Sequence, residues 1–198
     1  MDPHNRDTPL LSPDIAAVAR IVRDGGVVAY PTEAVFGLGC RPDAAAAAIE
    51  RILALKQRPA DKGLIVVTDS LERVLHWLQP LTAEQRAAVD ASWPGPTTWL
   101  WPARPECPAL LRGDHDSLAV RVSAHPAVRA LCAAADSALV STSANRAGEA
   151  PCRDWQCVRD TFATGIDAIL QAECGSRGAP SAIRDARSGR WLRGAPDQ

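Results

Sequence analysis

The chain has 198 residues, of which 46% are hydrophobic and 23% are charged, and its formal net charge is −1. This length and composition suit one globular domain with a substantial core, and the near-neutral charge argues against a broad basic surface for nucleic acid. No apolar run is long enough to span a membrane, and residues 1–14 are too polar and acidic for a signal peptide, so we expect a cytoplasmic protein without membrane attachment.

Helices and strands are expected to alternate along the chain. Capping residues and apolar periodicity predict helices at residues 12–24, 43–58, 71–78, 82–92, 125–135 and 154–162. Short apolar runs predict buried strands at residues 27–30, 64–67, 97–101, 117–122, 138–141 and 166–171, followed by a hairpin over 181–192. Ser12 is the expected cap of the first helix, residues 31–39 an expected loop, and residues 1–11 an expected flexible segment. The alternation predicts a single α/β domain over residues 1–198, with a mixed sheet and a core at about 12–193.

Polar residues fall where these predicted strands end. Thr32 follows the first strand, the run Ser141-Thr142-Ser143-Ala144-Asn145 follows another, and Arg121 lies near the end of a third. Sheets of this class bind ligands in crevices at strand ends, so these side chains are candidates for a binding site. The alternative for the hydroxyl-rich run is an ordinary turn, and the alternative for the arginine is a surface ion pair.

Lysine is almost absent from the chain. Among 22 basic side chains only Lys56 and Lys62 are lysines, and both lie in one seven-residue segment that also holds Arg58. Lysine offers a compact point charge where arginine offers a planar fork, and phosphate accepts either. The segment is therefore a candidate anion site, with chance clustering of solvated charges as the alternative.

Several common catalytic patterns are missing from the sequence. It contains no GxxxxGK[ST], no GxGxxG after the first strand and no GxSxG, and its histidines and six cysteines show no metal-ligand spacing, so we expect reduced thiols and no protein-bound metal. What remains is a set of cations and small polar groups at loop positions, which suits an anionic ligand or phosphoryl and nucleotidyl transfer. These candidates are Lys56, Arg58, Lys62, Arg121, Arg193, Thr32, Ser117, Ser141, Thr142, Ser143, Ser181 and Asn145.

Five short motifs follow one another along the chain. They are Tyr30-Pro31-Thr32-Glu33-Ala34-Val35-Phe36-Gly37-Leu38-Gly39, Lys56-Gln57-Arg58-Pro59, Trp93-Pro94-Gly95-Pro96, Ser117-Leu118-Ala119-Val120-Arg121 and Ser141-Thr142-Ser143-Ala144-Asn145. With these motifs the chain resembles the YrdC/TsaC family of threonylcarbamoyl-AMP synthases from about Ser12 to Arg193. The resemblance implies a single YrdC-like domain whose twisted mixed sheet and flanking helices surround a large concave basic cavity.

The resemblance also implies a reaction and its residues. L-threonine, bicarbonate or CO2, and ATP with Mg²⁺ would give threonylcarbamoyl-AMP and pyrophosphate, for modification of adenosine 37 in tRNA by a downstream threonylcarbamoyl-transfer complex, with at most weak direct tRNA binding. The implied catalytic residues are Lys56 and Arg58. The implied ATP-binding residues are Lys56, Arg58, Lys62, Ser117, Ser143, Asn145 and Arg193, and the implied threonine-binding residues are Thr32, Arg121, Ser141 and Ser181.

Some positions depart from the usual family pattern. Ala34, Val67 and Lys62 stand where many members have Thr, His and Asn, and Pro151-Cys152 replaces a Ser-Pro pair. These departures affect the expected threonine contacts more than the nucleotide contacts, and the chain is expected to be the short bacterial type. Two other functions stay open: an RNA-binding module for tRNA or ribosome maturation, and a carbamoyl-transfer domain like that of hydrogenase maturation proteins.

Overall fold

Ten strands form one mixed sheet in the order β1-β8-β2-β3-β7-β4-β6-β5-β9-β10, in a computed structural model that describes residues 8–44 and 46–194. The strands are β1 (Leu10–Ser12), β2 (Val28–Pro31), β3 (Phe36–Gly39), β4 (Ile65–Thr68), β5 (Thr97–Pro102), β6 (Ser117–Val122), β7 (Leu139–Ser143), β8 (Ala168–Leu170), β9 (Ala182–Asp185) and β10 (Trp191–Arg193). Parallel pairs join β8 to β1 and β2, β4 to β6, and β5 to β9, and the remaining neighbours are antiparallel. The predicted mixed sheet is therefore confirmed.

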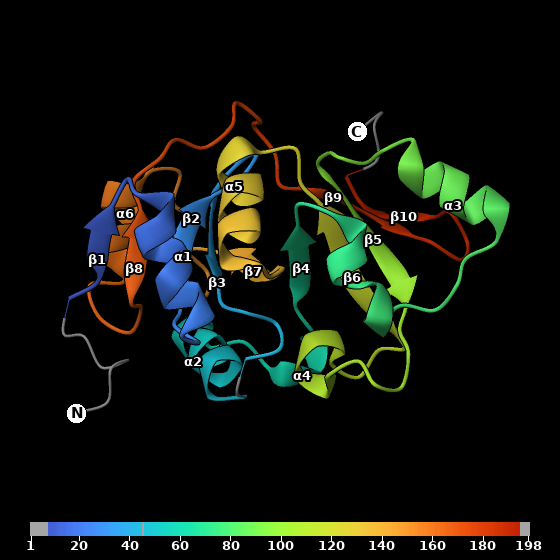
Figure 1. The fold of residues 1–198 in the computed structure, drawn as a ribbon, viewed down its shortest axis with the longest axis horizontal. Helices are drawn as coiled ribbons and strands as arrows, with labels where there is room; N and C mark the ends of the chain where they lie inside the picture. The colour runs from blue at the N-terminus through green and yellow to red at the C-terminus, as the bar shows by residue number, and fades with distance from the viewer. Residues whose placement is uncertain (1–7, 45, 195–198) are drawn as a thin grey trace.

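Helices cover both faces of this sheet (Figure 1). They are α1 (Ile15–Arg23), α2 (Ala46–Lys56), α3 (Ala83–Asp90), α4 (Ala109–Arg112), α5 (Pro126–Ala135) and α6 (Trp155–Thr161), with 3-10 turns at Ala60–Lys62, Leu71–Arg73 and Leu75–Trp77. Helices α1 and α5 pack against each other in front of β2 and β8. Two of these helices begin as the sequence predicts, because the side chains of Thr82 and Asp154 accept hydrogen bonds from the first-turn backbone of α3 and α6.

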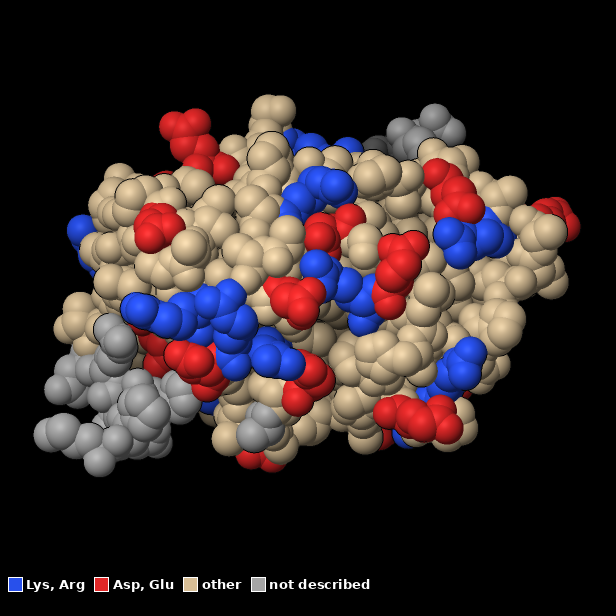
Figure 2. Space-filling model, in the orientation of Figure 1, with Lys and Arg blue, Asp and Glu red and all other residues tan. Residues whose placement is uncertain are grey.

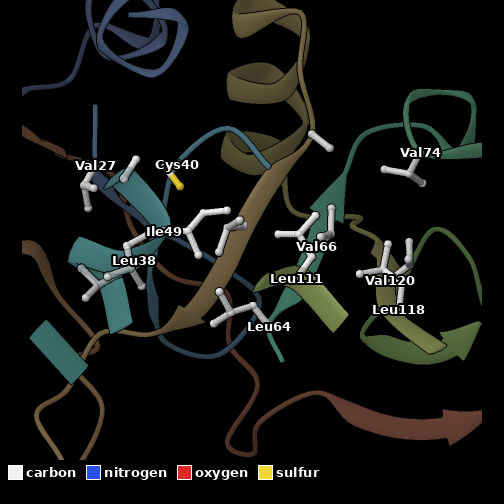
Figure 3. Packing of buried hydrophobic residues seen from close by; sticks show 14 of the residues in the cluster. Val27, Leu38, Cys40, Ile49, Leu64, Val66, Val74, Leu111, Leu118 and Val120 are labelled. Atoms are coloured by element: carbon white, nitrogen blue, oxygen red, sulfur yellow. The ribbon is translucent and has the colours of Figure 1, made fainter. Parts of the chain in front are cut away.

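Alternation along β2 divides the core in two. Val28 and Tyr30 face the core that α1 and α5 cover. Ala29, and Val27 just before the strand, face the core that contains Ile49 of α2. This is the period of two that a strand buried on both faces requires. Figure 3 shows the second core from nearby, with Val27, Leu38, Cys40 and Ile49 gathered in one group. The cavity described below therefore rests on a sheet that is packed on both sides.

The structure near the start of the described chain differs from the prediction. Leu10–Ser12 is strand β1, paired in parallel with β8, rather than part of a flexible segment; residues 1–7 lie outside the described residues. Ser12 ends that strand, and the cap of α1 is Asp14, whose Oδ1 accepts from the Ala16 backbone at 2.8 Å. The prediction failed because the short strand gains its backbone partners from β8, far along the chain.

Three further elements differ from their predictions. Residues 36–39 of the predicted loop form β3, because the Thr32–Val35 turn folds the chain back and pairs β3 with β2. The predicted helix at 71–78 is two short 3-10 turns, and α4 was not predicted. The other predicted helices and strands are confirmed to within a few residues, including the hairpin β9–β10.

Not all of the cysteines are reduced thiols. Cys152 and Cys157 form a disulfide, with their Cα atoms 5.5 Å apart. The Asp154 cap turns the chain into α6 between them and brings the two side chains together. A CxxxxC spacing carries no such signal in the sequence, so the expectation of six free thiols was wrong for this pair, whereas Cys40, Cys107, Cys132 and Cys174 are free.

Candidate functional site

A cavity of about 350 Å³ is walled by the turn between β2 and β3, by β6 and β7, and by both ends of the β9–β10 hairpin. All the predicted site residues except Lys56 and Asn145 line it. Those that do are Thr32, Arg58, Lys62, Ser117, Arg121, Ser141, Thr142, Ser143, Ser181 and Arg193. The sheet thus brings together side chains from six separate stretches of the chain, as the positions at strand ends predicted.

The wall of the cavity is strongly biased toward positive charge. Among the described residues that line it, the single carboxylate of Glu33 is accompanied by six cationic side chains, those of Arg58, Lys62, Arg112, Arg121, Arg177 and Arg193. On the face that Figure 2 draws, acidic and basic side chains are interleaved. The cavity wall therefore carries a local excess of positive charge in a chain whose formal net charge is −1.

Sequence reasoning missed four charged or titratable residues of the wall: Glu33, Arg112, His115 and Arg177. Arg112 ends α4, a helix that the sequence did not reveal, and His115 follows it. Arg177 belongs to residues 171–181, which we call the strap, a segment without regular structure between β8 and β9. Only Glu33 had a signal available, since it lies inside a quoted motif.

Lys56 is buried and binds the turn after β7 rather than facing the cavity. Its Nζ donates to Ser143 O, Asn145 O and Asn145 Oδ1, at 2.7 Å in each case. Burial and the nearby Arg58 guanidinium lower the pKa of Lys56 to about 8. The compact ammonium meets three oxygens that surround one nitrogen, which a planar guanidinium does not do. Lysine suits this position because its ammonium binds three oxygens of the protein itself.

Asn145 completes this turn. Its Oδ1 also accepts from Ser143 Oγ at 2.6 Å, and its Nδ2 donates to Arg146 O and Glu149 O. With Lys56 these bonds fix the run from 143 to 149 and leave the Ser143 side chain at the cavity wall. Lys56 and Asn145 thus reach the cavity through Ser143.

The end of α2 separates Lys56 from Arg58. Gln57 has φ of 49°, in the left-handed region, and the backbone N–H groups of Gln57 and Arg58 donate to Ala54 O and Leu53 O. This pair of bonds is a Schellman C-cap with glutamine in the position that glycine usually fills. The reversal sends Arg58 to the cavity wall, where its Nε and Nη2 donate to Gly63 O at 3.2 and 2.9 Å.

That carbonyl is held by a close backbone approach. Gly63 and Gly113 have φ of 60° and 62°, and a Cβ atom on Gly113 would lie 2.1 Å from Asp61 O. Only glycine fits there, so the 3-10 turn that carries Lys62 packs directly on the end of α4. This contact places Lys62 and Arg112 on the same wall.

Arg121 is the most deeply buried cation of the wall, with 5% of its surface exposed. Its Nη2 lies 3.3 Å from Glu33 Oε2, and its Nε has no hydrogen-bond partner among the described residues. Ser141, also buried, lines the cavity from strand β7, which β4 separates from β6. A guanidinium on a cavity wall is suited to a carboxylate ligand, which it can bind with two parallel hydrogen bonds.

The β9–β10 hairpin supplies Ser181 and Arg193. Arg193 donates from Nε and Nη2 to Ser181 O at 3.1 and 2.8 Å, and burial together with Arg121 lowers the pKa of Arg193. The hairpin is anchored by Arg184, whose guanidinium lies 4.9 Å from the ring centre of Trp99 and 5.0 Å from that of Trp191. These cation–π contacts fix the strand that carries Arg193.

Thr32 lies at the opposite wall, in the turn between β2 and β3. Its Oγ1 donates to Val35 O at 2.7 Å, and its carbonyl accepts from Gly175 N of the strap at 2.9 Å. The strap is also bound at Arg177, whose backbone N–H donates to Glu33 O. The turn and the strap therefore form one bonded rim of the cavity.

The described residues contain no cluster of three or more His, Cys, Asp or Glu side chains that would hold a metal ion. The one carboxylate of the cavity wall, Glu33, is already engaged by Ser123 and Arg121. Such a wall fits a hard cation that is carried mainly by phosphate oxygens and water, as Mg²⁺ is on a nucleotide.

In the part of the chain that the structure covers, no helix is long and apolar enough to cross a membrane.

Comparison with known proteins gives one consistent result. Residues 20–194 match the Sua5/YciO/YrdC family model, which carries the description telomere recombination. The chain is 51% identical to a threonylcarbamoyl-AMP synthase of Nitrosococcus oceani, over 90% of this chain and 96% of that protein. It is 50% identical to a protein of the same name from Xanthomonas campestris pv. campestris, over 92% and 98%.

A solved structure agrees. The P. abyssi Sua5 protein complexed with L-threonine superposes with a TM-score of 0.83 at 28% identity, covering 94% of this chain. The chain spans 56% of the length of that structure. The fold and the order of the motifs agree with the near-complete coverage of the two bacterial synthases, and the chain belongs to the Sua5/YciO/YrdC family.

Proposed function

We infer that this protein makes threonylcarbamoyl-AMP from L-threonine, bicarbonate or CO2, and ATP. The observation that carries the inference is the cavity: six cations wall a hollow of about 350 Å³ in a chain about 50% identical to enzymes named for this reaction. The product is the activated group for threonylcarbamoyl modification of tRNA. Two anions must meet in this reaction, so a cavity of concentrated positive charge suits it.

We assign the finer chemistry to nucleotidyl transfer. The threonine ammonium gives up two protons to solvent as its nitrogen adds to CO2 and forms a carbamate. A carbamate oxygen then attacks the α-phosphorus of ATP, and pyrophosphate leaves with the electron pair of the broken P–O bond. The ATP phosphates would hold Mg²⁺, which would shield their charge. The protein residues orient the two substrates and stabilise negative charge, and no residue of the wall has to form a covalent intermediate.

The wall divides into two regions in this proposal. Arg58, Lys62, Ser117, Ser143 and Arg193 face the nucleotide, with Arg58 nearest to the reacting phosphates. Lys56 and Asn145 act on the same region by holding Ser143.

Arg121 and its neighbours take the threonine. Arg121 binds the carboxylate, and Thr32, Ser141 and Ser181 bind the rest of the amino acid. Support comes from the place of Arg121 on the cavity wall and from the threonine complex of the P. abyssi relative.

Threonine-dependent release of pyrophosphate tests the proposal. The purified protein is mixed with ATP, Mg²⁺ and bicarbonate, and pyrophosphate is followed with and without L-threonine. We expect release only with threonine, and at least a hundredfold less from Arg58→Ala, since removal of one such charge-stabilising donor costs about 10²–10³ in rate. Release that does not depend on threonine, or that Arg58→Ala leaves unchanged, would reject it.

Transfer to tRNA is the next step that we assign to partners. The activated threonylcarbamoyl group passes to a separate transfer complex, and this protein itself binds tRNA at most weakly because its formal net charge is only −1. Tight tRNA binding at physiological salt in the absence of ATP chemistry would instead favour an RNA-binding module.

A further inference from the structure

The Arg121 end of the cavity is unusual because it contains a fixed negative charge. Ser123 Oγ donates to Glu33 Oε1 at 2.6 Å, and the Glu33 carbonyl accepts from the strap at Arg177 N. Glu33 Oε2 has no hydrogen-bond partner among the described residues, and it lies 3.3 Å from Arg121 Nη2. The carboxylate is therefore pinned on one side and contacts Arg121 only by charge on the other.

The contact between Glu33 and Arg121 adds little to the stability of the fold, although it buries two charged groups. The side chains of Glu33 and Arg121 are 13% and 7% exposed, and leaving a buried carboxylate oxygen and a buried guanidinium N–H unsatisfied costs free energy. A better-aligned pair would have satisfied both groups. The geometry instead keeps the negative charge in place beside a guanidinium that lines the cavity.

Without Glu33 the two ends of the cavity would be electrostatically alike. Arg58, Lys62, Arg112 and Arg193 line the nucleotide region and Arg121 lines the other, and the two regions are close enough that Arg121 contributes to the lowered pKa of Arg193. A triphosphate is attracted to any of these cations. Among the described wall residues only Glu33 distinguishes the Arg121 end.

We propose that Glu33 is a specificity-determining residue, whose fixed carboxylate admits a zwitterionic amino acid at Arg121 and excludes phosphates and other ligands of net negative charge. This inference rests on the proposed function. A zwitterion brings an ammonium group beside its carboxylate, which offsets the repulsion from Glu33, whereas an anion of similar size brings no such group. Discrimination then arises from an unfavourable contact with the wrong ligand.

Equilibrium dialysis with radiolabelled L-threonine, in the absence of ATP, measures this discrimination. The competitors are 2,3-dihydroxybutanoate, which replaces the threonine ammonium with a hydroxyl, and inorganic phosphate. In the wild-type protein the hydroxy acid should bind at least about tenfold more weakly than threonine, a difference of 1.4 kcal/mol. In Glu33→Gln this ratio should fall about tenfold, and phosphate should displace threonine about tenfold more readily.

Two variants serve as controls. Glu33→Asp keeps the charge and should keep most of the discrimination, and Glu106→Gln makes the same chemical change at an exposed carboxylate and should behave as the wild type. A ratio that falls less than threefold in Glu33→Gln would overturn the inference. Equal binding of the hydroxy acid and threonine by the wild-type protein would also overturn it, even if Glu33→Gln does not fold.

The outcome separates this inference from the proposed function. A wild-type protein that does not bind threonine would overturn both. A wild-type protein that binds threonine and releases pyrophosphate, with unchanged discrimination in Glu33→Gln, would overturn the role of Glu33 alone.

Discussion

Replacing Lys56 with methionine tests the turn that this lysine holds. The change removes three hydrogen bonds of 2.7 Å to Ser143 and Asn145 and leaves two carbonyl oxygens and an amide oxygen without that donor. Each bond from a charged donor stabilises by about 1.5–3 kcal/mol, and relief from burying the ammonium returns part of this. We expect a net loss of about 3 kcal/mol in the free energy of unfolding, or roughly 6–12 °C in Tm for a chain of this size.

Lys56→Arg tests the shape of the donor. Arginine keeps the charge but cannot direct three N–H groups from one nitrogen, so we expect a loss of about 1–2 kcal/mol and at least a tenfold fall in kcat/KM for ATP. Urea unfolding gives the stability, and threonine-dependent pyrophosphate release gives the activity. Lys62→Met is the matched stability control, because this exposed lysine should change the free energy of unfolding by less than about 0.5 kcal/mol.

Two results would refute this reasoning. A Lys56→Arg enzyme with wild-type stability and activity would show that the three oxygens do not require an ammonium. A Lys56→Met protein with wild-type stability but a raised KM for ATP would show that the lysine acts on the ligand and not on the turn.

Three further predictions concern the same part of the molecule. Because the pKa of Lys56 is lowered to about 8, kcat/KM should fall as pH rises through 8, and activity that stays constant to pH 10 would contradict this. The contribution of Lys56 to the free energy of unfolding should rise between pH 8 and pH 10.5, the ordinary pKa of a lysine, because in that range Lys56 is protonated only in the unfolded chain. Gln57→Gly should stabilise the protein by about 0.5–1 kcal/mol in urea unfolding, because Gln57 has positive φ; a destabilised variant would argue against the C-cap. Reducing the Cys152–Cys157 disulfide with dithiothreitol should cost about 2 kcal/mol for so small a ring, and Cys157→Ser should lose both this stability and the response to reductant; a response that persists in the variant would mean another target.

Local signals in the sequence predicted most of the fold. The capping box of Thr82 and Gln85 forms as expected, with both reciprocal hydrogen bonds present, and the residues of β6 are those predicted. These elements are specified by neighbours in sequence. Strand β1 is specified instead by pairing with β8, and β3 by pairing with β2 and β7. A local pattern in the sequence therefore did not reveal them.

The candidate site shows the same division. Residue type and position after strands were enough to select Thr32, Arg121 and Ser141, which all line the cavity. Arg177 could not be selected, because its place depends on backbone bonds between the strap and the β2–β3 turn. The orientation of Lys56, toward protein oxygens, depends on where β7 ends and was equally beyond local reasoning.

The path of the strap has a consequence for how the molecule folds. Strand β8 lies next to one edge of the sheet and β9 next to the other, so residues 171–181 cross the molecule, along the upper edge of Figure 1, and bind Thr32 and Glu33 on the way. The rim of the cavity therefore closes only after contacts between distant parts of the chain have formed, which is the slow kind of contact in folding. Partly folded chains would have their cations dispersed and would bind nucleotide poorly. The rate at which refolding molecules gain ATP binding should thus report the last step of folding, and ATP should stabilise only the completed domain.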